Sequence, residues 1–136
     1  MAAEHMVEVE VLTPEGEVFN GEARQVSTRT AVGELGILAN HAPLLAALHP
    51  AELRLHVSDS ETKRYAQSHG WLQVFGNKAK LLVEEAIDPA DLDPATLKEQ
   101  LADAEQCLAE AAGDGAQARA QKDRERAEAF LAIAQR

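Results

Sequence analysis

The sequence has little cysteine, few aromatic residues and no long apolar run, and each shortage excludes a class of protein. Cys107 is the only cysteine among 136 residues, so an internal disulfide is impossible and a reducing compartment suits the chain. Aromatic residues make up 4% of the chain, so a core must rest on Val, Leu, Ile and Ala. No run approaches the roughly 18 apolar residues of a membrane-spanning helix, and residues 1–10 do not form a signal peptide.

Basic residues are also in the minority, with 13 Lys and Arg against 23 Asp and Glu, for a formal net charge of −10. Such a surface repels nucleic acid and anionic lipid, so neither nucleic acid nor direct membrane insertion is expected. The five histidines show no i, i+4 pair and no neighbouring ligand cluster, so no metal site is predicted. Neither a phosphate-binding Gly-rich loop nor a Gly-x-Ser-x-Gly nucleophile is present. The sequence thus indicates a non-catalytic protein without a cofactor.

The first 85 residues alternate between apolar and polar side chains at a period of two. Val7, Val9 and Val11 share one face and Glu8 and Glu10 the other, which predicts a half-buried strand over 6–12. Further strands are expected at 17–20, 23–30, 35–38, 44–48, 52–58, 62–68, 71–75 and 78–84. Many short strands without intervening helices favour two sheets packed face to face in a β-sandwich.

Glycines mark the expected irregularities of these strands. Gly21 permits a turn or bulge, and Gly70 permits a bulge or a close backbone approach. The dipeptide Gly76-Asn77 suits a type II′ hairpin turn. In the run 33–48, Gly33 and Gly36 predict a tight bend with Glu34 at its tip, residues 40–43 break the chain, and 44–48 resumes as a buried strand.

The composition changes at residue 86, where two prolines enter a polar linker. Asp93 followed by Pro94 suits the N-cap and first position of a helix. Two apolar stripes with helical spacing follow, separated by a turn at 113–115: Leu97, Leu101, Ala104, Leu108 and Ala111, then Ala116, Ala120, Ala127, Phe130, Leu131 and Ala134. We therefore expect a sandwich domain over 1–86 and a linker with an antiparallel two-helix hairpin over 87–136, the second helix running from about 116 to 135.

The contact face of this hairpin is mostly alanine, which contributes under ~1 kcal/mol per buried methyl where a leucine contributes ~2. The hairpin should therefore be held weakly and be able to move. A basic cluster lies on its second helix: Arg119, Lys122, Arg124 and Arg126. Two interpretations of the cluster stay open, a solvated face with i, i+4 ion pairs or a face that meets an acidic partner.

The run 33–45 resembles the signature of the epsilon subunit of bacterial F-type ATP synthases, Gly-Asp/Glu-Leu-Gly-Ile-x-x-x-His-Ala-Pro-Leu-Leu. Ala39-Asn40 departs from the usual Pro-Gly, but Asn tolerates the left-handed conformation and can keep the turn. Segments 18–21, 68–74, 77–85 and 86–95 are also similar to the family, with Lys80 and Glu84-Glu85 as departures.

The resemblance implies a non-catalytic central-stalk rotor subunit of a proton-translocating ATP synthase, monomeric when isolated. As part of that complex it would be peripheral on the cytoplasmic face of the bacterial plasma membrane. The sandwich would bind the gamma subunit near His41, Ala42 and Pro43, and Glu34 would face the c-ring loops. The mobile hairpin would inhibit ATP hydrolysis by placing the basic cluster against acidic surfaces of the catalytic alpha/beta head.

Some members of this family bind ATP at an Ile/Leu-Asp-x-x-Arg-Ala motif. Leu92 and Asp93 match it, but Thr96 replaces the arginine and has no charge for a phosphate. We expect no tight ATP binding, and Asp93 is explained as a helix cap. The alternative to the rotor subunit is a generic β-sandwich protein-binding module with a helical self-association tail.

Overall fold

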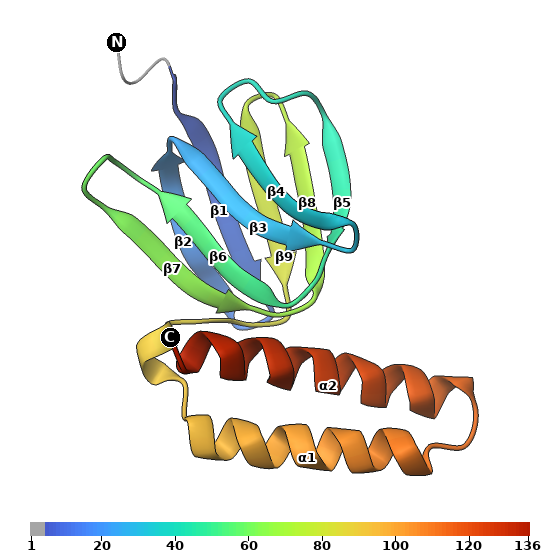
Figure 1. The fold of residues 1–136 in the computed structure, drawn as a ribbon. Coiled ribbons are helices and arrows are strands. Elements are labelled where there is room, and N and C mark those ends of the chain that lie inside the picture. Colours follow the sequence, from blue (N-terminus) through green and yellow to red (C-terminus); the bar gives the residue numbers. More distant parts are fainter. Residues whose placement is uncertain (1–4) are drawn as a thin grey trace.

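A computed structural model describes residues 5–136 as a β-sandwich with a helical hairpin below one end (Figure 1). This arrangement confirms the predicted fold class. The strands are β1 Val7–Thr13, β2 Gly16–Ala23, β3 Gln25–Thr30, β4 Gly33–Leu38, β5 Leu44–Leu48, β6 Ala51–His56, β7 Thr62–Gln67, β8 Gly70–Phe75, β9 Lys78–Val83 and β10 Ala86–Ile87. A 3₁₀ turn, η2 Pro89–Asp91, precedes the helices α1 Pro94–Glu110 and α2 Asp114–Ala134.

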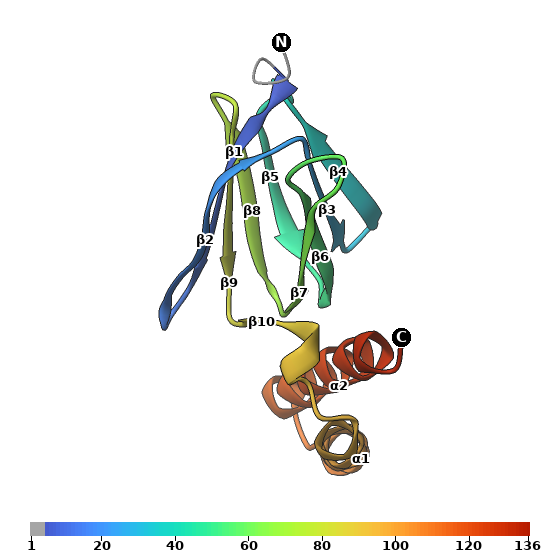
Figure 2. The ribbon, with the colours of Figure 1, turned by 90° about the vertical axis from the view of Figure 1, so that its left-hand side faces the viewer.

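The strands form one sheet that folds over into two layers, seen edge-on in Figure 2. The order is β10-β7-β6-β3-β5-β8-β9-β1-β2, with β4 on the free side of β3. The single pair Thr30–Leu48 joins β3 to β5, so the ladder is nearly interrupted where the layers meet. β1 runs parallel to β9 and antiparallel to β2. β10 still pairs with β7, so the sheet continues through Ile87.

Alternation along the strands places the core between the layers. Val7, Val9 and Val11 are at most 1% exposed while Glu8 faces solvent, as the period of two predicts. Aliphatic side chains from both layers complete the core: Val26, Ile37, Leu48, Leu53, Leu55, Leu72, Val74, Leu81 and Val83. Each such burial contributes about 1.5–3 kcal/mol, so the sandwich holds most of the chain's apolar stabilisation.

The predicted bend between Gly33 and Gly36 is wrong. The turn lies before the two glycines, at Ala31-Val32. β4 begins at Gly33, whose φ of 130° suits glycine. Glu34 therefore lies within a strand, directly opposite Arg29 of β3. The β3–β4 register runs from Gln25–Leu38 to Thr30–Gly33, so it places the turn outside the glycine pair.

Three further local expectations need correction. Gly21 interrupts nothing, because β2 runs through it and pairs it with Val9. β5 is buried on one face only, and Leu45 is 68% exposed. Gly76 and Asn77 both have φ of 58°, which is the pattern of a type I′ turn and not of type II′.

Gly70 confirms the expected close backbone approach. A Cβ built there would lie 2.1 Å from the carbonyl oxygen of Leu82 on the neighbouring β9. No side chain fits in that space, so glycine is required where β8 begins.

The hairpin starts where the sequence predicts. Asp93 caps α1 by accepting from Ala95 N, and Pro94 is its first residue. α2 begins at Asp114, two residues before the expected start, because only Gly113 is needed for the turn, with φ of 91°. α2 lies between the sandwich and α1 (Figures 1 and 2).

A small apolar cluster joins the hairpin to the sandwich. It contains Ala66 of β7, Leu97 of α1, and Phe130 and Ile133 of α2. Ile133 was absent from the predicted stripe, whereas the predicted Leu131 and Ala134 are half-buried beside the cluster. Within residues 5–136, no helix has the length and apolar character needed to cross a membrane.

Candidate functional site: the contact between the sandwich and α2

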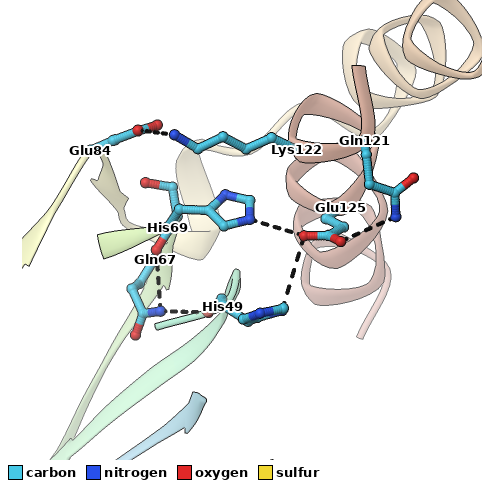
Figure 3. A network of polar contacts seen from close by, with 8 residues as sticks. His49, Gln67, His69, Glu84, Gln121, Lys122 and Glu125 are labelled. Carbon is cyan, nitrogen blue, oxygen red and sulfur yellow. Dashed lines mark hydrogen bonds and ion pairs between the residues drawn. The ribbon is translucent and has the colours of Figure 1, made fainter. Parts of the chain in front are cut away.

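Two adjacent acidic residues after β9 hold two basic residues of α2. Lys122 Nζ donates to Glu84 Oε1 at 2.5 Å (Figure 3). One helical turn further on, Arg126 Nε donates to Glu85 Oε1 at 2.5 Å and its Nη2 to Glu85 Oε2 at 3.0 Å. The i, i+4 spacing places both cations on the same face of α2, toward the end of β9.

Arg126 also joins the two helices of the hairpin. Its Nη1 donates to Gln100 Oε1 of α1 at 3.1 Å, and its guanidinium lies over the Phe130 ring, 4.7 Å from the centroid. The hydrogen bonds to Glu85 raise the pKa of Arg126; partial burial acts against them, and the charges of Glu85 and Asp123 add to them. One side chain thus connects the sandwich, α1 and α2.

A second contact converges on Glu125 of α2, where Figure 3 shows two histidines approaching it from the sandwich. Its Oε2 lies 3.0 Å from His69 Nε2 and 4.0 Å from His49 Nδ1. Gln121 donates to the other carboxylate oxygen at 3.1 Å. Gln67 donates to the His49 carbonyl at 2.7 Å and so fixes the loop before β6.

The environment of Glu125 favours its ionised form. Partial burial alone would raise its pKa, but hydrogen bonds from His69 and Gln121 and the charges of His49 and His69 outweigh burial, and the pKa is lowered. The docked hairpin therefore holds Glu125 as an anion.

This joint suits reversible docking. The cationic and carboxyl side chains of the Lys122–Glu84 pair are 46% and 56% exposed, and pairs exposed to this degree contribute about 0–1 kcal/mol. The apolar cluster beside them is small. Within the described part of the chain, no three metal-ligating side chains gather into a site. These ion pairs and the apolar cluster hold α2 against the sandwich.

Comparison with known proteins gives the family. Residues 6–89 match the family described as ATP synthase, Delta/Epsilon chain, beta-sandwich domain. The ATP synthase epsilon chain of Persephonella marina is 44% identical over 105 residues, which cover 77% of each chain. The epsilon chain of Sulfurihydrogenibium sp. is 37% identical over 130 residues, which cover 95% of this chain and 97% of its relative. This chain belongs to the ATP synthase epsilon chains.

Solved structures agree on the fold. A chain in the cryo-EM structure of the Euglena gracilis mitochondrial ATP synthase, OSCP/F1/c-ring, aligns with a TM-score of 0.79 at 19% identity, covering 93% of this chain and 80% of that one. A chain in the central stalk/c-ring structure from Tetrahymena thermophila gives 0.68 at 19% identity, covering 93% and 95%. The membership confirms the prediction of an epsilon subunit, a non-catalytic part of ATP synthase, in place of a generic binding module.

The structure separates the members of the predicted basic cluster of this epsilon chain. Lys122 and Arg126 contact the sandwich, as described above. Arg124 lies 3.7 Å from Glu128 in an i, i+4 pair, and Arg119 is exposed. Two of the four cations therefore contact the sandwich while the hairpin is docked.

The other predicted contact residues lie at opposite ends of the sandwich. Glu34 is exposed near the hairpin end, where the preceding turn shares a hollow with Glu125 and Glu128. The loop with His41, Ala42 and Pro43 lies at the far end, beside the β8–β9 turn, and Asn40 N donates to Asn77 Oδ1 there. Asn40 has φ of 61°, which confirms the expected left-handed residue.

Asp93 is occupied as a helix cap. Its Oδ1 accepts from Ala95 N at 3.2 Å, and its Oδ2 accepts from Thr96 Oγ1 at 2.7 Å. Thr96, which stands at the arginine position of the ATP motif, thus completes the cap.

Sequence reasoning missed an apolar face on β5, β8 and β9. Its exposed members are Leu45 at 68%, Trp71 at 54%, Phe75 at 69% and Leu82 at 45%. A cavity of about 580 Å³ next to this face is lined by Trp71 and Leu82 and reaches Lys122. The signal was present, because these residues are apolar at positions out of phase with the buried ones.

Proposed function

We propose that this epsilon chain is a rotor subunit of the central stalk, which links the gamma subunit to the c-ring of a proton-translocating ATP synthase. We further propose that its hairpin inhibits ATP hydrolysis when it leaves the sandwich. Family membership supports the first part. The observation that carries the second is the joint itself, in which Lys122 and Arg126 hold α2 through exchangeable ion pairs.

The gamma subunit would contact the apolar face of β5, β8 and β9 together with the loop at His41, Ala42 and Pro43. Four large apolar side chains exposed on adjacent strands favour a protein partner, because burying them on association is favourable. The loop lies at the end of the same layer, where β5 begins, so one partner can reach both.

The c-ring loops would contact the opposite end at Glu34. An exposed carboxylate at the start of β4 is accessible to a basic loop. Because the docked α2 borders this end, the hairpin and the c-ring would be neighbours in the assembly.

In the inhibitory state, Lys122 and Arg126 would exchange Glu84 and Glu85 for acidic residues of the alpha/beta head, and Arg119 and Arg124 would join them. Each lost ion pair is replaced by another, so the exchange costs little. As part of the complex, the chain would be peripheral on the cytoplasmic face of the bacterial plasma membrane. ATP would bind at most weakly, since Asp93 is used as a cap.

ATP hydrolysis by the cognate alpha, beta and gamma subunits tests this proposal, with added full-length chain or a version ending at Asp88. We expect both versions to bind the gamma subunit and only the full chain to inhibit. Equal binding without inhibition would remove the brake and keep the rotor role. Failure of both versions to bind would refute the rotor role.

A further inference from the structure

Arginines gather on the outer face of β3, β6 and β7. Arg54 of β6 lies directly opposite Arg64 of β7. Arg29 shares the same face, because it lies two residues beyond Ser27, the β3 partner of Arg54. Like charges placed opposite each other on a sheet are unfavourable unless something compensates them. A concentration of cations is unexpected in a chain of net charge −10.

Arg54 carries an unsatisfied donor. Its Nε is the one buried side-chain nitrogen or oxygen that lacks a hydrogen-bond partner in residues 5–136. A buried donor without an acceptor is unfavourable, so the guanidinium of Arg54 is poorly satisfied in its present position. Neither Arg29 nor Arg54 forms an ion pair with any residue that the structure describes.

The nearby carboxylates do not neutralise the face. Glu52 accepts from Arg64 at 3.1 Å and lies 3.3 Å from Arg136, so two arginines already share it. Glu34 is exposed opposite Arg29 without an ion pair to it. Three of these arginines, Arg29, Arg54 and Arg136, line one hollow together with both glutamates, which leaves its lining a formal charge of +1.

A hollow of about 320 Å³ lies between this face and the end of α2. Arg29, Arg54 and Arg136 line it together with Glu34 and Glu52, and Ala129, Ala132 and Ile133 of α2 form its other wall. This volume is at the lower limit of ligand pockets, which suits a small ligand. Because α2 supplies one wall, the hollow is complete only while the hairpin is docked.

We propose that this hollow is a binding site for a phosphate group, free or as a monoester, held by Arg54 and Arg29. The planar guanidinium forks of Arg54 and Arg29 match phosphate oxygens. The anion also screens Arg54 from Arg64. This site does not use the ion pairs at Glu84 and Glu85, and it shares Glu34 with the proposed c-ring contact.

Calorimetric titration of the full-length chain with inorganic phosphate at constant ionic strength tests the site. We expect saturable binding of one phosphate per chain. Arg54→Gln should weaken binding at least tenfold, while Arg119→Gln, with the same loss of charge on the exposed face of α2, should change it less than twofold. Equal weakening by both variants would refute the site, because it would mean nonspecific charge attraction.

A second measurement guards against misfolding of the Arg54 variant. In the unaltered chain, the Nε–H resonance of Arg54 should shift on phosphate addition and reach a plateau, and Arg29→Gln should reduce the affinity. Binding of methyl phosphate at similar strength would support a monoester source, and exclusion of methyl phosphate would support free phosphate. Acetate binding as tight as phosphate, or no shift at Arg54, would overturn the proposal.

Discussion

Arg126 of α2 and Glu85 of the sandwich form a two-point ion pair, with Nε–Oε1 at 2.5 Å and Nη2–Oε2 at 3.0 Å. The same guanidinium contacts Gln100 of α1 and Phe130 of α2, so this pair connects the sandwich to both helices of the hairpin.

Arg126→Gln should weaken hairpin docking by about 1 kcal/mol, a value discounted for the partial exposure of the pair. That corresponds to about a fivefold shift toward the released hairpin. The chain offers its own probes, because Trp71 is the only tryptophan on the sandwich and the exposed Cys107 of α1 is the only thiol. Energy transfer from Trp71 to a dye on Cys107 should fall. The energy transfer should fall less in Arg126→Lys and should not change in Arg119→Gln. Equal losses of energy transfer in all three variants would contradict the role of the two-point geometry.

Glu125 should make docking sensitive to acid. The pKa of Glu125 is lowered from the ordinary 4.5 in the folded chain. The ionised carboxylate therefore stabilises the docked hairpin fully above pH 4.5, and this stabilisation is lost as the pH falls through the lowered pKa of the folded chain. Energy transfer in the unaltered chain should decrease with acid over this window more than in Glu125→Gln. Identical acid profiles for the two proteins would rule out a contribution from Glu125.

Gly70→Ala should destabilise the sandwich by about 3 kcal/mol, because the new methyl would clash with the Leu82 carbonyl of β9. Gly115→Ala is the matched control, since open space surrounds Gly115 in the first turn of α2, and it should stabilise by up to about 1 kcal/mol. Urea unfolding measures both. Equal stability of the two variants would mean that the strands separate freely at Gly70.

Trp71→Ala should reduce the affinity for the cognate gamma subunit at least tenfold if the apolar face is the contact, because large aromatic side chains dominate such interfaces. Val32→Ala is the control, since Val32 is 98% exposed on the β3–β4 turn, away from the apolar face. Binding measured by surface plasmon resonance should be unchanged by the control. An unaffected Trp71 variant would place the gamma contact elsewhere.

Asp93→Ala should destabilise the hairpin by about 1 kcal/mol through loss of the helix cap, visible as reduced helical circular dichroism on mild heating. Calorimetry with ATP should show no micromolar binding to the unaltered chain. Tight ATP binding that disappears in Asp93→Ala would show that the residue is a ligand as well as a cap.

Several features follow from short stretches of sequence. The alternation of Val7, Val9 and Val11 predicts β1, and Asp93-Pro94 predicts the start of α1 to the residue. These signals are local, because a strand face and a helix cap depend on neighbours within a few positions. The signature run also led to the family without any knowledge of the fold.

The tertiary structure decided which surfaces meet. Glu84 and Lys122 are 38 residues apart, and Glu85 and Arg126 are 41 apart, so no local pattern pairs them. Their contact depends on the rotation of α2 about its axis and on its docking below β9. In the same way, Arg29, Arg54 and Arg64 share one face only because three separate strands pair in this register. The sequence alone determined the elements and the family, whereas long-range packing determined the joint and the arginine hollow.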